Sequence, residues 1–447
     1  PIFEQSSTSE NGLNTAHRKA ALDEFSLNIV EHILDKSKAP LFIHAGDMLN
    51  SSCSAEFRKA VKIFDKNKPW YIAPGNHDGF YLGVSSPQEW GGISGKSTKG
   101  ELFGSLNERI GWGQACMNAS YWEETKKKNR EGRYEEISKN IMDKYSFIQA
   151  YIEHLGIDKD NAEVVSSSNE IEYVCSESKD SSVLDGERKG YLKNICWSRD
   201  KNFPKDKSHF VDKAWKHFVV QLISVPHKKT TKNILIIDSA NYDEGVAVNS
   251  DGGGRLFGGG AADNAFLTKE QIKVINEIST NYKNKGGIDL IVGHHPLADY
   301  KYPSREPLLK LIGETNLKLY VSGDTHDGYD VEYTIGNSEK IRESNLGSTI
   351  DAPIEYAKLS FRDSPKDYYL DRRALTQFKE YENEGFSEKL KVSKYKKLEK
   401  DYGTVDALWG KCTEKFFGYD HDLDTAHPIK LSKLGLEEKD KFWGNKY

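Results

Sequence analysis

The chain has 447 residues, of which 29% are charged, and its formal net charge is −5 at pH 7. This length favours two or three domains, or one α/β unit carrying insertions. The acidic balance argues against general nucleic-acid binding, which usually shows as a basic excess. No apolar run approaches the ~20 residues of a membrane span, so we expect a soluble protein.

The chain carries five cysteines, which are odd in number and widely spaced: Cys53, Cys116, Cys175, Cys196 and Cys412. This spacing fits a reducing compartment or incidental thiols better than a disulfide framework, and one bridge, such as Cys175–Cys196, stays open. No signal peptide is visible, although the start at Pro1 leaves room for an upstream segment. We expect a cytoplasmic location or secretion into a reducing compartment.

Helix and strand alternate over the first eighty residues. Apolar periodicity predicts a helix over 15–36, and a short apolar strand at 40–45 then runs into Gly46-Asp47. A second helix, about 54–66, precedes a strand at 70–73 that runs into Gly75-Asn76-His77-Asp78. Continuous apolar strands alternating with helices predict a buried sheet covered by helices.

This alternation breaks between about 80 and 212. A Gly/Ser-rich stretch comes first, a helix is predicted over 134–155, and the segment 166–182 reads as polar and irregular. We expect residues 81–212 to form an insertion or cap region at the rim of the core, where functional variation concentrates.

The alternation resumes near residue 217. Strands are predicted at 217–224, 233–239, 289–292 and 317–322, the last two running into Gly293-His294-His295-Pro296 and Gly323-Asp324-Thr325-His326. Helices are predicted at 268–282, with Thr268 as cap and Gln271 three residues on, and near 305–313. A hairpin is expected over 329–335 and 340–345, and helices at 374–400 and 404–417. The expected domains are a core of 1–80 and 213–358, the insertion of 81–212, and a helical C-terminal appendage of 359–447.

Four separated loops therefore carry metal-binding residue types directly after a strand. Strand ends converge at one edge of an open α/β sheet. Two divalent ions ~3.5–4 Å apart activate a water and neutralise a phosphate ester, but they need a bridging carboxylate, further ligands and a proton donor. Asp47 can bridge and His77 can donate the proton. The expected metal ligands are Asp47, Asn76, His294, Asp324 and His326.

The motif order GD, GNHD, GHHP and G-x-x-H resembles the calcineurin-like metallophosphoesterase superfamily. The resemblance covers about 40–80 and 215–350, including the segment Leu267 to Gln271 before a helix and the ending Asn345-Leu-Gly-Ser. It implies a four-layer α/β/β/α sandwich with a dinuclear centre, of which Mn is the first expectation and Fe, Zn or Mg the others.

Roles carried over from the resemblance attach to single positions. Asp47 bridges the two ions. Asn76, His294 and Asp324 hold one ion, and His326 holds the other. His77 together with Asp78 handles the proton of the leaving group.

Three departures from the family pattern bear on this site. The family's leading Asp-x-His motif is absent and would lie at or before Pro1, so within this chain the second ion has only Asp47 and His326. Asp324 stands where the family has histidine, which shifts the metal preference toward Mn or Mg. Asn50 stands where the family has the second acid of Gly-Asp-x-x-Asp.

Each candidate also has a plainer interpretation. Asp47 can be a turn former, and Asn76 and Asp78 can make an Asx turn in which His77 is incidental. His294 is the expected ligand with His295 beside it, although the reverse assignment stays open. Two further residues have plainer interpretations. His44 fits a core histidine. Arg255, in a glycine-rich loop, is either a phosphate clamp or a solvated cation.

The resulting hypothesis is a metal-dependent phosphomonoester hydrolase. Arg255 and His295 are the substrate-binding candidates, and a phosphoprotein is among the expected substrates because the insertion and tail can build a docking surface. Large polar additions to such a core also resemble bacterial effector phosphatases of the Legionella Wip type. The alternatives are a phosphodiesterase or nuclease of the same fold, which the charge disfavours, and a pseudo-phosphatase that acts as a binding module.

Overall fold

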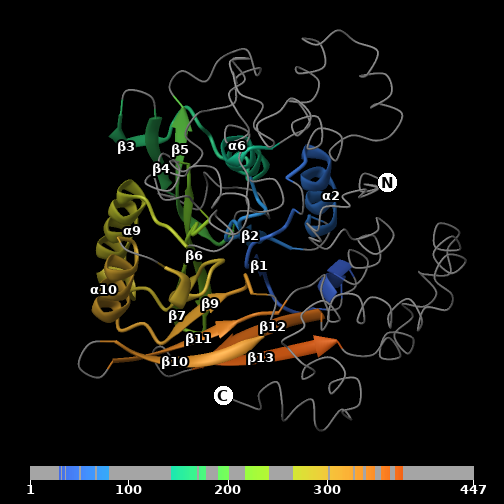
Figure 1. The fold of residues 1–447 in the computed structure, drawn as a ribbon, viewed down its shortest axis with the longest axis vertical. Coiled ribbons are helices and arrows are strands. Elements are labelled where there is room, and N and C mark those ends of the chain that lie inside the picture. Colours follow the sequence, from blue (N-terminus) through green and yellow to red (C-terminus); the bar gives the residue numbers. More distant parts are fainter. Residues whose placement is uncertain are drawn as a thin grey trace, which may run out of the picture.

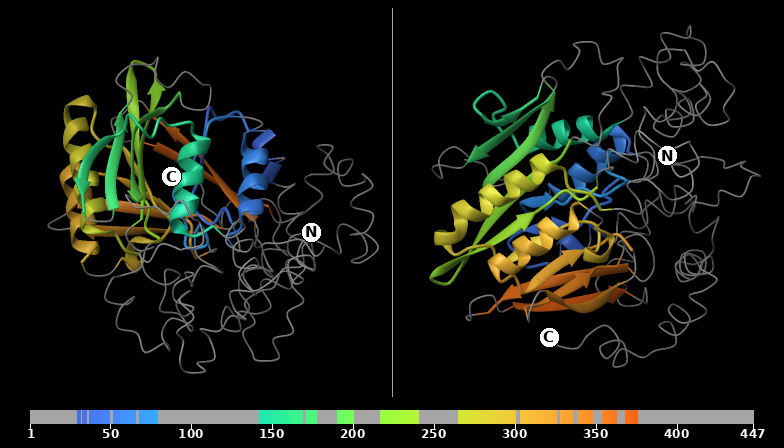
Figure 2. Two further views of the ribbon diagram at one scale, coloured as in Figure 1. Left: turned by 90° about the horizontal axis from the view of Figure 1, so that it is seen from above. Right: turned by 60° about the vertical axis from the view of Figure 1, so that its left-hand side comes forward.

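A nine-stranded mixed sheet forms the centre of the molecule, with helices on both of its faces (Figures 1 and 2). The α/β class predicted from the sequence is therefore confirmed. The computed structural model describes residues 30–31, 33–35, 37–49, 52–65, 68–79, 142–168, 171–177, 190–200, 217–240, 265–300, 303–325, 328–335, 339–347, 354–362 and 368–375.

The large sheet has the strand order β10-β11-β9-β8-β7-β6-β5-β4-β3. Pairing is parallel from β7 through β8 and β9 to β11, and antiparallel elsewhere. Parallel strands end at a common edge, so the loops that follow β7, β8 and β9 lie together. The strands are β3 (Glu163–Ser167), β4 (Ile171–Glu177), β5 (Leu192–Asp200), β6 (Val219–His227), β7 (Thr230–Ile236), β8 (Leu290–Val292), β9 (Leu319–Ser322), β10 (Tyr329–Ile335) and β11 (Glu339–Asn345).

Two smaller strand pairs lie beside this sheet. β1 (Phe42–His44) pairs in parallel with β2 (Trp70–Ile72), and β12 (Ile354–Phe361) pairs antiparallel with β13 (Tyr368–Leu375). In the described residues these are separate two-stranded sheets. The four-layer sandwich therefore stays a prediction.

Among the described residues, helices cover both sides of the sheets (Figure 2). α2 (Ser54–Phe64) and α6 (Lys144–His154) lie on the side of β1 and β2, while α9 (Lys269–Tyr282) and α10 (Arg305–Thr315) cover the opposite face of the large sheet. Two short 3-10 turns, η2 (Lys283–Lys285) and η3 (Leu297–Asp299), follow α9 and β8.

The core divides into two clusters because β6 is buried on both faces. Val219 and Ile223 point into the cluster that contains α2 and α6, whereas Val220 and Leu222 point into the cluster under α9 and α10. Successive side chains of a strand alternate between faces. A strand buried on both sides therefore reads as a continuous apolar run, as its sequence predicts.

The helices predicted at 54–66, 268–282 and 305–313 and the predicted hairpin are confirmed. α9 begins after Thr268, whose side chain accepts the Gln271 N–H at 3.0 Å. The Gln271 side chain does not complete a capping box, because its Oε1 accepts no hydrogen bond from the described residues; its Nε2 donates to the Asp238 carbonyl at 2.6 Å. The hairpin forms as β10 and β11.

The prediction of irregular structure over 166–182 was wrong for part of that segment. Ile171–Glu177 is strand β4, with Ile171, Tyr173 and Val174 buried. The apolar residues of this strand are few and are flanked by polar residues, so the sequence pattern did not indicate a strand. Residues 163–200 thereby add three strands to the sheet that contains β6. Of the helix predicted over 134–155, residues 144–154 are helical as α6, and 134–141 lie outside the described residues.

Both ends of the chain are described only in part. Residues 30, 31 and 33–35 of the predicted first helix are helical. The prediction of a helical appendage over 359–447 was wrong for its described part, because β12 and β13, which reach residue 375, pair with each other as strands. The rest of the appendage lies outside the described residues. Among the described residues, no helix is both long and apolar enough to cross a membrane.

The incidental-thiol interpretation was wrong for three cysteines. Cys175 and Cys196 face each other across β4 and β5 and form a disulfide with a Cα–Cα distance of 4.1 Å. Cys53, at the start of α2, is also disulfide-bonded. The bridge that the sequence left open is thus the one that forms between β4 and β5.

Candidate metal centre

The described loop residues meet around one imidazole nitrogen. His294 Nε2 lies 2.9 Å from Asn76 Oδ1, 3.1 Å from Asp324 Oδ1 and 3.4 Å from Asp47 Oδ1. His294 is fully buried, and the side chains of Asp47 and Asp324 are each 16% exposed. Three oxygens and one nitrogen therefore converge from the ends of β1, β2, β8 and β9.

A backbone carbonyl fixes the orientation of His294. Its Nδ1 lies 2.7 Å from the Ala45 carbonyl oxygen, which can only accept, so Nδ1 carries a proton. In the neutral imidazole the lone pair is then on Nε2, facing the three oxygens. The N–H groups of Gly323 and Asp324 donate to the His294 carbonyl at 2.8 and 3.1 Å, which couples the β8 and β9 loops.

Gly46 explains why this histidine can approach the β1 loop. Its φ is +102°, and a Cβ there would lie 2.2 Å from His294 Nδ1. Asp47 follows at a φ of +56°, a conformation that non-glycine residues seldom adopt and that clusters at functional sites. Its Oδ1 accepts the His77 N–H at 2.9 Å. The positive φ angles and the close approach of His294 thus explain why glycine and then aspartate occupy positions 46 and 47.

Asp78 joins the two loops of the small sheet. Its buried carboxylate accepts N–H groups from Gly75 at 2.9 Å, Leu49 at 3.0 Å and Met48 at 3.3 Å. Burial, and then the charge of Asp47, raise the pKa of Asp78 to about 7. The backbone contacts give Asp78 a loop-holding geometry, and its predicted partnership with His77 stays a prediction.

The electrostatics of the cluster centre on His294. Burial alone lowers the pKa of His294, but the Asp47 and Asp324 carboxylates and the Ala45 carbonyl outweigh it and raise that pKa to about 10. Burial likewise opposes ionisation of Asp47, whose pKa is nevertheless lowered by His294 and His77. His44 lies partly buried next to this cluster, and desolvation lowers its pKa to about 4. The carboxylates of Asp47 and Asp324 therefore favour the positively charged form of His294.

The donor set fits a hard divalent cation. A single proton on His294 Nε2 can satisfy one of the three surrounding oxygens, whereas a cation at their centre satisfies all of them together. Carboxylate and amide oxygens with one imidazole suit Mn or Mg. His294, His295 and Asp324 also offer ligand atoms within 4.8 Å of one another. His326, Asn50 and Arg255 lie outside the described residues.

Ser239 is a site residue that the sequence interpretation missed. Its hydroxyl lies 2.9 Å from His295 Nδ1 and accepts the N–H groups of His294 and His295 at 3.3 and 3.1 Å. The Tyr320 hydroxyl holds the same turn by donating to the His295 carbonyl at 2.8 Å. A signal was present, since Ser239 is a polar residue at the very end of the predicted strand 233–239, close to where the ligands lie on their own strands.

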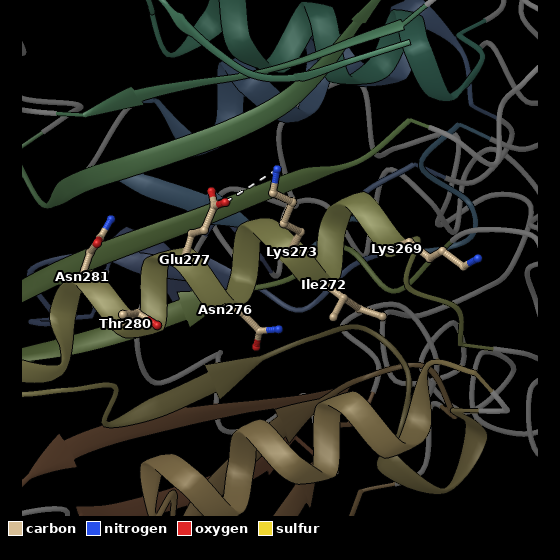
Figure 3. Close-up of a pocket in the computed structure, with 7 residues that line it drawn as sticks. All are labelled: Lys269, Ile272, Lys273, Asn276, Glu277, Thr280 and Asn281. Atoms are coloured by element: carbon tan, nitrogen blue, oxygen red, sulfur yellow. Dashed lines mark ion pairs between the residues drawn. The ribbon is translucent and has the colours of Figure 1, made fainter.

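A surface pocket of about 680 Å³ lies on α9, lined by residues between Lys269 and Asn281 (Figure 3). Figure 3 shows these side chains along one helix, with Lys273 and Glu277 forming an ion pair at 3.9 Å. None of the loop residues that surround His294 lines this pocket. It is therefore separate from the candidate metal centre.

The chain belongs to the calcineurin-like phosphoesterase family, whose model matches residues 22–276. This family is one of metal-dependent phosphoesterases, and the donor set around His294 fits a divalent cation. The family resemblance read from the motifs is confirmed.

Comparisons with individual proteins add little to this. A comparison with curated proteins gives no match. Among solved structures, the chain is similar to one titled "GAP50 the anchor in the inner membrane complex of Plasmodium", with 15% identity and a TM-score of 0.19. The match covers 39% of this chain and 50% of that one, so the chain spans half the length of that relative. A likeness this low supports no functional statement.

Proposed function

We propose that the protein is a metal-dependent phosphomonoester hydrolase with a phosphoprotein among its substrates. The observation that carries the proposal is the convergence of Asn76, Asp324 and Asp47 oxygens on His294 Nε2, at 2.9, 3.1 and 3.4 Å. Family membership supports phosphoester hydrolysis in general. The monoester preference, the protein substrate and a dinuclear centre are our proposals.

In this proposal Asp47, Asn76, His294 and Asp324 hold one divalent ion, of which Mn is our first choice. Asp47 would also face a second ion together with His326. A bound ion supplies Lewis-acid chemistry, polarising a phosphoryl oxygen and lowering the pKa of water. The oxygen-rich donor set supports Mn or Mg over a thiophilic metal.

His77 is the proposed proton donor to the leaving alkoxide. Its backbone N–H is fixed on Asp47 Oδ1, so the residue is held beside the ligand set, and it is half-buried. General acid catalysis needs a donor within hydrogen-bond reach of the leaving oxygen. His295, held by Ser239, and Arg255 are the proposed contacts to substrate phosphate.

Residues of 81–212 and 359–447 outside α6 and β3–β5, which pack into the core, are the proposed docking surface for a phosphoprotein. The support is their length and polar composition. The pseudo-phosphatase alternative also has a specific observation, because Asp324 replaces a family histidine directly at His294 Nε2.

Hydrolysis of p-nitrophenyl phosphate and of its bis-ester, each with and without Mn²⁺, tests the proposal. We expect Mn²⁺-dependent turnover that favours the monoester. Preference for the bis-ester would assign a phosphodiesterase instead. No turnover of either ester by a chain extended upstream would favour the binding-module alternative.

A further inference from the structure

Two buried lysine–aspartate ion pairs lie at opposite ends of strand β7. Lys144 Nζ is 2.8 Å from Asp238 Oδ1, and both side chains are fully buried. Lys232 Nζ is 3.3 Å from Asp289 Oδ1, with the side chains 7% and 6% exposed. Asp238 follows the end of β7, whereas Lys232 lies near its start. The first pair is thus at the sheet edge that carries the candidate metal centre, and the second is at the far edge.

Lys144 is fixed against the turn that carries Asn76. A Cβ on Gly79, whose φ is +124°, would lie 2.6 Å from Lys144 Cα. The neighbouring Ser52 hydroxyl accepts the Gly79 N–H at 2.9 Å and donates to the Met142 carbonyl. The start of α6 is therefore packed tightly against the Gly75–Gly79 turn.

Asp238 is fixed against the other half of the centre. Its carboxylate accepts the Val219 N–H at 3.3 Å and the Ala240 N–H at 3.2 Å. The next residue, Ser239, accepts the backbone N–H groups of His294 and His295. Because Ser239 is the next residue in the chain, the position of Asp238 constrains the position of the loop that carries His294 and His295.

The ion pair therefore connects the two halves of the centre, which come from different sheets. Asn76 follows β2 of the small sheet, and His294 follows β8 of the large sheet. A fully buried ion pair adds little net stability over apolar replacements, because desolvation offsets the attraction. The ion pair nevertheless fixes one arrangement, because separating the two side chains would leave each buried charge without a counter-ion.

We propose that the Lys144–Asp238 ion pair is a positioning device that holds the Gly75–Gly79 turn in register with the Ser239 and His294 loops and so sets the metal affinity of the centre. This inference rests on the proposed metal site. Residues that orient metal ligands from behind typically change metal affinity ~10- to 100-fold when replaced.

The experiment compares Lys144→Met with Lys232→Met in the full chain, since the two pairs have the same chemistry at opposite ends of one strand. Mn²⁺ affinity is measured by calorimetric titration, and thermal unfolding is measured in EDTA. We expect both variants to lower the unfolding temperature. Lys144→Met alone should also weaken Mn²⁺ binding, ~10- to 100-fold.

Unchanged Mn²⁺ affinity in Lys144→Met would overturn the inference, and so would equal weakening in Lys232→Met, which would indicate a general loss of stability. Absence of Mn²⁺ binding by the unaltered chain would overturn the metal site itself. If Lys144→Met does not fold, Asp238→Asn and Asp289→Asn give the same comparison with smaller changes in shape.

Discussion

At the scale of single residues, the candidate centre depends on how one histidine is oriented. The Ala45 carbonyl accepts a hydrogen bond from the Nδ1–H of His294, which leaves Nε2 to face Asn76, Asp324 and Asp47. Loop motifs predicted that these residues gather, because each follows a strand. They could not predict the Ala45 contact, since a backbone carbonyl has no signature in a sequence.

His77 gives the first prediction at this scale. His77→Ala should lower turnover of p-nitrophenyl phosphate ~10²- to 10⁴-fold with Mn²⁺ content unchanged, because it removes a proton donor while the backbone N–H that binds Asp47 stays. Steady-state kinetics and elemental analysis measure the two effects. His154→Ala, at the end of α6 where His154 pairs with Asp65, is the control. An unchanged rate in His77→Ala would exclude the acid role.

His294 gives a prediction for pH. Folding raises the pKa of His294 from 6.5 to about 10, because the Asp47 and Asp324 carboxylates raise it by more than burial lowers it. The charged imidazole thus stabilises the metal-free protein fully below pH ~6.5, and this contribution is lost as the pH rises through about 10. Mn²⁺ needs the neutral ring, so its affinity should rise with pH in the same window.

Urea unfolding in EDTA between pH 6.5 and 10 measures the stability term, with His294→Gln as the control that lacks it. The unaltered chain should lose stability relative to that variant as the pH rises. Parallel stability curves for the two proteins would contradict the pKa shift.

At the scale of elements, helices with strong periodicity and caps were predictable and short polar strands were not. α9 begins where Thr268 caps it, and β10 and β11 form the expected hairpin. β4 was missed because its apolar residues Ile171, Tyr173 and Val174 are few and lie among serines and glutamates. Pairing with β5, rather than local preference, makes that segment a strand.

The β4–β5 pair gives a prediction for stability. Replacing both Cys175 and Cys196 by serine should lower the free energy of unfolding by about 3 kcal/mol, because the bridge closes a loop with a sequence separation of 21 residues. Denaturant unfolding measures it. The unaltered chain in reducing agent should lose more, since Cys53 is also disulfide-bonded. Identical stabilities with and without the two cysteines would contradict a structural role for the bridge.

At the scale of the whole molecule, the candidate centre lies where two sheets meet. The β1 and β2 loops supply Asp47 and Asn76, and the β8 and β9 loops supply His294 and Asp324. Sequence motifs identified these four loops. The contacts that hold the sheets together were not predictable, because Lys144 and Asp238 are 94 residues apart and neither lies in a motif.

The segment expected to be an insertion also contributes to this arrangement. α6 buries Phe147 and Tyr151 in the core next to β2, and the Tyr151 hydroxyl donates to Gln221 at 2.7 Å. Gln221 in turn donates to the Ile72 carbonyl at 2.8 Å. Residues 144–154 thus bridge the small and large sheets beneath the centre.

The most direct test of the central claim is the divalent metal content of the unaltered chain and of Asp47→Asn, both equilibrated with Mn²⁺. Asparagine keeps an oxygen that can accept the His77 N–H, so the fold should persist while the charged ligand is lost. Asp160→Asn, at an exposed position, is the matched control. We predict Mn²⁺ in the unaltered chain and in Asp160→Asn, and none in Asp47→Asn. Full Mn²⁺ content in Asp47→Asn, or none in the unaltered chain, would contradict a metal centre built from these loops.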